Sequence, residues 1–229
     1  MHEFEMPQEY VERVIARQGR AHTCESFDGP TTALLVVDMQ NYFVDERYQA
    51  ASPTARDNVP SINRLAEAMR QAGGRVIWVQ NAAPWESERS WATQKERYLP
   101  EKARLRWEAM QPEAEGFRLW PRLEVHDNHD LRVVKRRYSA FTRGSSDIEI
   151  VLQDHGLQTL LITGVATNAC CESTARDAMM LNYRAVMVSD GCAAVTDREH
   201  AAALENFYLY FGDVLTTSEV IDRLRPGAA

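Results

Sequence analysis

The sequence has little cysteine and no long apolar segment. Cysteines number only four among 229 residues, and their positions (24, 170, 171 and 192) lack the paired spacing of zinc sites. We therefore expect reduced thiols and a cytoplasmic protein. No segment approaches the roughly 18 apolar residues of a membrane span, so we expect no membrane association. The charged N-terminal segment lacks the apolar centre of a signal peptide.

An excess of basic residues is also missing. Lys and Arg total 26 against 33 Asp and Glu, which gives a formal net charge of -7. Nucleic-acid-binding domains normally carry a basic patch, so we expect no nucleic-acid partner. The length suits one large α/β domain. We expect an N-terminal arm over residues 1–28 and a single domain over residues 29–229.

Buried-strand patterns alternate with helical patterns along most of this domain. The expected strands are 33–38, 75–80, 131–135, 158–163, 185–189 and 213–216, and the expected helices are 58–72, 146–156, 169–182, 198–209 and one from about 218. Ser146 and Glu149 have capping-box spacing at the start of one of these helices. The alternation predicts an α/β fold with a doubly wound, mainly parallel sheet.

The stretch from about 82 to 120 interrupts the alternation. It is rich in Trp, Glu, Arg and Pro, and it is too long for a simple connection between a strand and the next element. Insertions of this length in α/β enzymes are often lids or substrate loops. Its tryptophans are interpreted either as lid aromatics or as anchors of a subunit interface.

Three reactive side chains follow three of the expected strands. Asp38 closes the first strand, Lys135 closes the third, and Cys170 follows the fourth at the start of a helix. Ligands of open α/β sheets bind beyond the carboxyl ends of the strands. The sequence therefore predicts that these residues share one rim of the sheet, although each alone has an ordinary structural interpretation.

The chemistry of this trio is that of a cysteine hydrolase. A helix N-terminus and the ammonium of Lys135 are expected to stabilise a thiolate at Cys170. Asp38 can accept the thiol proton and pass it to a leaving amine, while a thioacyl intermediate waits for water. The turn over residues 164–170 is expected to aim backbone N–H groups at the oxyanion.

Two adjacent cysteines compete for the role of nucleophile. Cys171 begins an apolar row with Ala175, Ala178 and Met179, which is expected to face the sheet. Cys170 points about 100° away around a helix. The periodicity favours Cys170 but does not decide between the two.

Three segments resemble the isochorismatase-like cysteine hydrolases. They are Val-Val-Asp-Met-Gln-Asn at 36–41, Lys-Arg-Arg-Tyr-Ser-Ala-Phe at 135–141, and Gly-Val-Ala-Thr-Asn-Ala-Cys-Cys-Glu-Ser-Thr-Ala-Arg-Asp at 164–177. The resemblance covers roughly residues 30 to 225 and implies a six-stranded parallel sheet flanked by helices. It also implies a catalytic triad of Asp38, Lys135 and Cys170, because the family nucleophile is the first cysteine after Ala-Thr-Asn-x.

The resemblance further implies backbone features at the nucleophile turn. One is a non-proline cis peptide between Val165 and Ala166. The other is an oxyanion hole formed by the N–H groups of Ala166 and Cys170.

Differences within the family narrow the expected activity. Isochorismatases lack the cysteine, so Cys170 argues against that reaction. Nicotinamidases carry an Asp-x-His-x-x-His metal site, whereas residues 81–86 here contain no histidine, so we expect no metal and no cofactor. The pattern is closest to ureidoacrylate amidohydrolase, and biuret, triuret and N-carbamoyl amino acid hydrolases are the alternatives. The expected partner is a small amide or ureido substrate.

Position alone suggests which other residues contact the substrate. The candidates are Gln40, Asn81, Trp85, Glu86 and Tyr138. A metal at His126 and His129 is less expected, because both lie in a polar loop.

Rival hypotheses are a carrier-protein or partner-binding module, and a redox role for the Cys170–Cys171 pair. The arm and the aromatics suggest a homo-oligomer, a dimer or tetramer, with the arm crossing to a neighbour.

Overall fold

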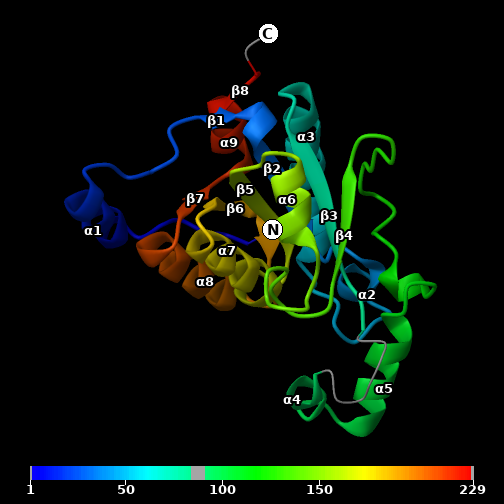
Figure 1. The fold of residues 1–229 in the computed structure, drawn as a ribbon. Coiled ribbons are helices and arrows are strands. Elements are labelled where there is room, and N and C mark those ends of the chain that lie inside the picture. Colours follow the sequence, from blue (N-terminus) through cyan, green and yellow to red (C-terminus); the bar gives the residue numbers. More distant parts are fainter. Residues whose placement is uncertain (1, 84–90, 228–229) are drawn as a thin grey trace.

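The computed structural model describes residues 2–83 and 91–227. Its centre is a six-stranded parallel sheet with helices on both faces (Figure 1). The strands are β2 (Thr32–Val37), β3 (Arg75–Asn81), β4 (Leu131–Lys135), β5 (Thr159–Val165), β6 (Arg184–Ala193) and β7 (Asp213–Leu215), in the order β4-β3-β2-β5-β6-β7. The predicted fold class is confirmed.

The helices alternate with these strands along the chain. They are α1 (Gln8–Gln18), α2 (Asn41–Val44), α3 (Val59–Gln71), α4 (Ala92–Lys95), α5 (Pro100–Ala109), α6 (Ile148–Asp154), α7 (Glu172–Met180), α8 (Asp197–Tyr210) and α9 (Thr217–Arg223). Short 3₁₀ turns occupy Gly29–Thr31, Ala55–Asn58 and Glu115–Phe117, and a π-helical turn, η4, occupies Thr167–Cys171.

Two hydrophobic cores cover the two faces of the sheet. One core joins alternate residues of β2, such as Leu34, to α3 and α9. The other joins the remaining β2 residues, such as Leu35, to α6, α7 and α8. Every residue of β2 and β5 is buried, which explains why their sequences are continuous apolar runs rather than alternating ones.

The strand order changes direction between β2 and β5. These strands approach unusually closely at Gly164, whose φ is +111° and where a Cβ atom would lie 2.0 Å from the Val37 carbonyl oxygen. Strand order reverses here, and ligands of doubly wound sheets bind at such switch points. The carboxyl ends of β2 and β5 therefore position the site.

Three local predictions differ from the structure. The strand expected at 185–189 extends over Arg184–Ala193. Ser146 and Glu149 do not form a capping box, because the Ser146 hydroxyl donates to the Ala140 carbonyl and accepts from the Ile148 amide. Met179 is 41% exposed rather than packed on the sheet.

The N-terminal arm lies on its own domain. Val14 of α1 is buried in the core beside α8, and the Arg17 guanidinium donates to the Leu209 carbonyl. At the end of the arm, β1 (Phe27–Asp28) pairs in parallel with β8 (Leu224–Arg225). The homo-oligomer and the crossing of the arm to a neighbouring subunit stay predictions.

The insertion between β3 and β4 carries α4 and α5. Both helices stand away from the main body of the molecule, on the side of α2 (Figure 1). Neither helix has a buried residue. Among the helices described, none is long and apolar enough to span a bilayer.

Candidate active site

Asp38 is the first residue beyond β2 at the switch point. Its φ of +54° places it in the left-handed region, which Asp tolerates better than most residues. Its amide donates to the Val79 carbonyl at 2.8 Å, and its own carbonyl accepts from Gln40 at 2.7 Å. The carboxylate is completely buried. The backbone thus turns sharply and directs Asp38 into the protein rather than toward solvent.

Lys135 is the last residue of β4, two strands away from Asp38. The register pairs it with Asn81 of the intervening β3. Its Nζ donates to Oδ2 of Asp38 at 2.8 Å and to the Arg137 carbonyl at 3.1 Å. Both partners of the ion pair have no exposed side-chain surface. A buried pair of this kind depends on close geometry, because water does not compensate either charge.

Cys170 lies in the π-helical turn η4, between β5 and α7. The Val165–Ala166 peptide before this turn is cis, as the resemblance implied. The Ala166 carbonyl accepts from the amides on either side of Cys170, those of Ala169 and Cys171. Cys170 is 6% exposed, and its side chain interacts with both Asp38 and Lys135. The structure therefore brings the three expected residues together.

The environment of Cys170 keeps its thiol protonated. Burial, followed by the negative charge of Asp38, raises the pKa of Cys170 to about 12, and the opposing effect of Lys135 is smaller. Lys135 lowers the pKa of the thiol in the expected direction, but burial and Asp38 outweigh it. A neutral resting thiol must lose its proton to a base during the reaction.

The charges of Asp38 and Lys135 depend on each other. Burial raises the pKa of Asp38, while Lys135 and hydrogen bonds from Cys170 and Lys135 act to lower it. Burial opposes the charge of Lys135, but Asp38 outweighs it and the pKa of Lys135 is raised. Oδ1 of Asp38 is buried and has no hydrogen-bond partner among the described residues that meets ordinary geometry. That oxygen can accept a further hydrogen bond.

Cys171 has a different environment from its neighbour. It is fully buried, and its thiol points to the Thr163 carbonyl at 3.7 Å. Its pKa is raised by burial and then by a hydrogen bond with Cys192. Cys171 is thus a core residue beside β5.

The side-chain amide of Gln40 bonds to backbone groups of two other segments. Its Nε2 donates to the carbonyls of Asn81 and Phe117 at 3.1 and 2.9 Å, and its Oε1 accepts from the Asn81 amide at 2.7 Å. These bonds occupy the side-chain amide with backbone partners, and the expected substrate contact of Gln40 stays a prediction. Gln40 instead ties the ends of β2 and β3 to the insertion.

The other expected substrate residues differ in position. Asn81 is buried at the end of β3 beside Lys135. Tyr138 is 37% exposed, and its ring meets Trp91 edge to face at 4.9 Å. Trp85 and Glu86 lie outside the described residues. Substrate contacts at Asn81 and Tyr138 stay predictions.

Two features near the site escaped the sequence reasoning. Thr167 of η4 shares a 2.8 Å hydrogen bond with Nδ1 of His200 on α8, and the His2 ring stacks on His200. Arg106 of α5 contributes positive charge at Asp38. Thr167 could have been identified from the sequence, because it belongs to the Ala-Thr-Asn motif before Cys170. No sequence pattern indicated His2, His200 or Arg106.

The described residues contain no group of three or more His, Cys, Asp and Glu side chains arranged to hold a metal. His126 and His129 form a turn in which the His129 amide donates to the His126 carbonyl.

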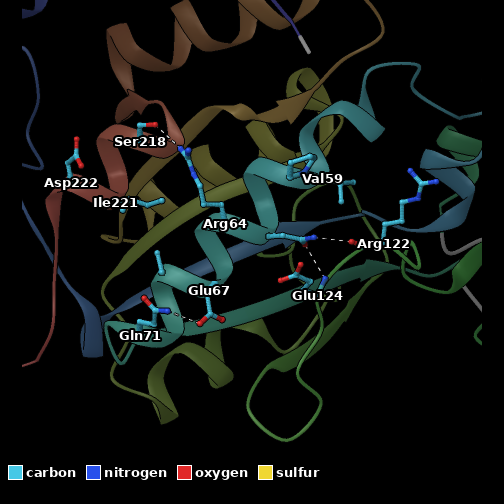
Figure 2. Close-up of a pocket in the computed structure, with 12 residues that line it drawn as sticks. Val59, Arg64, Glu67, Gln71, Arg122, Glu124, Ser218, Ile221 and Asp222 are labelled. Carbon is cyan, nitrogen blue, oxygen red and sulfur yellow. Dashed lines mark hydrogen bonds between the residues drawn. The ribbon is translucent and has the colours of Figure 1, made fainter.

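A separate groove of about 910 Å³ lies between α3 and α9 on one face of the sheet. Figure 2 shows Arg64 reaching from α3 to Ser218, and Glu67 beside Gln71. The residues of the triad do not line this groove, so it is not part of the candidate active site.

Comparisons with known proteins place this architecture in one family. The model of the isochorismatase domain matches residues 32–219. A protein of Arabidopsis thaliana described as a probable inactive nicotinamidase is 33% identical over 172 residues, which cover 75% of this chain and 85% of that protein.

Solved structures agree with this assignment. A cysteine hydrolase from Pseudomonas syringae pv. phaseolicola has a TM-score of 0.77 and 26% identity, covering 87% of this chain and 94% of its own. N-carbamoylsarcosine amidase from Thermoplasma acidophilum has the same fold, with a TM-score of 0.65 and 24% identity, covering 82% of this chain and 96% of its own. The chain therefore belongs to the isochorismatase family of hydrolases.

Proposed function

We propose that this protein hydrolyses a C–N bond of a small linear amide or ureido compound through a thioacyl intermediate on Cys170. The observation that carries this proposal is the contact of one thiol with a buried, hydrogen-bonded Asp38–Lys135 pair. A neutral thiol beside an accepting carboxylate oxygen needs no external base. The name of the structurally similar N-carbamoylsarcosine amidase supports a carbamoyl substrate.

The first half-reaction forms the thioester. Asp38 takes the proton of Cys170 as the sulfur attacks the carbonyl carbon, and the carbonyl oxygen becomes an oxyanion. The N–H groups of Ala166 and Cys170 hold that oxyanion. Asp38 then gives the proton to the leaving nitrogen, and the C–N bond breaks to release ammonia or an amine. Lys135 keeps Asp38 oriented and offsets its charge.

The second half-reaction restores the thiol. Water attacks the thioacyl carbon and loses a proton to Asp38, and the C–S bond then breaks. The departing sulfur of Cys170 recovers a proton from Asp38. A ureidoacrylate-like substrate is favoured by the sequence pattern, and biuret, triuret and N-carbamoyl amino acids are the alternatives.

Ammonia release from these compounds and from nicotinamide tests the proposal. We expect the wild type to release ammonia from a ureido or carbamoyl compound, and Cys170→Ser to lose at least about 10³-fold in kcat with an unchanged circular dichroism spectrum. Cys171→Ser is the matched control, and it should retain most activity. Full activity in Cys170→Ser would refute the mechanism. A stable protein partner together with inactivity on the whole panel would favour a binding module.

A further inference from the structure

The insertion brings an arginine to the rim of the candidate site. Arg106 lies in the last turn of α5, and its guanidinium carbon is 5.5 Å from the ring centroid of Tyr42 and 5.9 Å from that of Phe43. These two aromatic residues belong to α2, which begins three residues after Asp38. The packing of α5 on α2 therefore fixes Arg106 beyond the carboxyl end of β2.

Arg106 differs from the neighbouring arginines in its partners. Arg104 on the same helix pairs with Glu108 at 2.7 Å, and Arg118 farther along the insertion pairs with Glu115 at 3.1 Å. Among residues 2–83 and 91–227, the Arg106 guanidinium contacts the two aromatic rings and has no ion pair or hydrogen bond within ordinary distance. Aromatic rings engage the faces of a guanidinium, and its N–H edge stays available to an acceptor.

The charge of Arg106 acts on the catalytic carboxylate. Asp38 is completely buried, yet Arg106 is one of the groups that act to lower its pKa, after Lys135 and the hydrogen bonds of the triad. The insertion therefore supplies a positive charge that acts on the carboxylate beside the nucleophile. The Arg106 side chain is half-buried, and its ring partners leave the guanidinium N–H groups available to an acceptor.

We propose that Arg106 binds a carboxylate on the substrate, so that the substrate class is an anionic ureido or carbamoyl compound. This inference rests on the proposed function and chooses among its alternatives. A planar guanidinium matches a carboxylate with two parallel hydrogen bonds, and the rings of Tyr42 and Phe43 hold its plane in place. Ureidoacrylate and N-carbamoyl amino acids carry such a group, whereas biuret and triuret do not.

A matched pair of substrates tests the role of Arg106. 3-Ureidopropionate carries the carboxylate, and 3-ureidopropan-1-ol replaces it with a neutral hydroxymethyl group. For Arg106→Gln we expect kcat/KM for 3-ureidopropionate to fall about 10- to 100-fold, mainly through KM, and that for the alcohol to change less than about 3-fold. Arg106→Lys should recover part of the loss, because it restores charge without the planar fork.

Arg104→Gln is the control variant, since this residue lies on the same helix and is exposed and paired with Glu108. It should leave both substrates unaffected. An equal loss on both substrates for Arg106→Gln would overturn the inference, because a structural defect does not distinguish them. Unchanged kinetics on 3-ureidopropionate would overturn it as well.

A binding measurement separates this inference from the proposed function. In the Cys170→Ser background, calorimetry should show that 3-ureidopropionate binds about 10- to 100-fold more weakly when Arg106→Gln is added. If the wild type hydrolyses no ureido compound but this difference is found, the proposed function fails and the anion site stands. If anion binding is absent or independent of Arg106, the anion site is refuted whatever the turnover.

Discussion

The imidazole of His2 stacks on that of His200, with ring centroids 4.4 Å apart and planes 20° from parallel. Nδ1 of His2 lies 2.6 Å from Asp197 at the start of α8, and Nδ1 of His200 lies 2.8 Å from the Thr167 hydroxyl. Thr167 opens the turn that holds Cys170. The N-terminal arm is thus connected to the nucleophile turn through two imidazole rings.

This contact makes stability sensitive to acid. Burial, and then the charge of His2, lowers the pKa of His200 from 6.5 to about 4. Between these values the unfolded chain binds a proton at this residue and the folded protein does not. The free energy of unfolding should therefore fall by up to about 1.4 kcal/mol per pH unit as the pH drops from 6.5 toward 4. Above pH 6.5 the contribution of His200 to stability is fully present.

Urea denaturation at pH 7, 6, 5 and 4.5 measures this effect. His200→Gln should reduce the slope of stability against pH over this window. The exposed His155 provides the control, and His155→Gln should leave the slope unchanged. An identical slope in wild type and His200→Gln would contradict the assignment.

Asp38→Asn should make Cys170 more reactive toward alkylation while abolishing turnover. The negative charge of Asp38 contributes to the raised pKa of about 12, so its removal lowers the pKa of the thiol. Alkylation of the wild type by iodoacetamide should keep rising beyond pH 9, where an ordinary thiol levels off. In Asp38→Asn the alkylation rate of Cys170 should reach its plateau at a lower pH than in the wild type.

The measurement is the alkylation rate at Cys170 by peptide mass spectrometry, from pH 6 to pH 10.5. Lys135→Gln should shift the profile in the opposite direction, because Lys135 lowers the pKa of this thiol. A wild-type profile with its midpoint near pH 8.5 would show that the thiol is not buried beside a negative charge.

Gly164→Ala should destabilise the protein strongly. The new Cβ would lie 2.0 Å from the Val37 carbonyl oxygen at a φ of +111°. Gly156 also has a positive φ, +64°, but a Cβ there meets nothing within 4 Å. We expect a loss of about 3 kcal/mol or more for Gly164→Ala and about 1 kcal/mol for Gly156→Ala, measured by denaturant unfolding. Equal losses would contradict the close approach of β2 and β5.

Gln40→Leu should lower stability by about 2–4 kcal/mol. The change leaves the Asn81 amide and the carbonyls of Asn81 and Phe117 without their bonds to this side chain. Gln153→Leu is the matched control, since this exposed side chain bonds to Glu149 on the same helix. A loss below about 0.5 kcal/mol for Gln40→Leu would contradict this structural role of Gln40.

The sheet and the position of the trio could be predicted because their signals are short-range. Buried strands such as β2 and β5 are continuous apolar runs, Asp38 follows β2 directly, and Lys135 closes the less buried strand β4. Topology then places the ends of parallel strands at one edge.

The features of the site that could not be predicted depend on contacts between distant parts of the chain. The raised pKa of Cys170 follows from its burial against Asp38, and the helix-end argument alone gave the opposite sign. The backbone partners of Gln40, Asn81 and Phe117, lie on other segments and could not be predicted from its neighbours in the sequence. The approach of Arg106 to α2 and the stacking of His2 on His200 have no signature in local sequence.

The Lys135 side chain reaches across β3 to Asp38, so the Asp38–Lys135 pair forms only when β3 and β4 are paired in the correct register. Lys135 pairs with Asn81, and the residues before and after it are Val134 and Arg136. A slip of one position between β3 and β4 would turn the lysine to the opposite face and leave the buried carboxylate without its cation. A chain with β3 and β4 out of register could keep its secondary structure but would lack the Asp38–Lys135 pair. The pH dependence of Cys170 alkylation should therefore distinguish correctly folded molecules from compact misfolded ones.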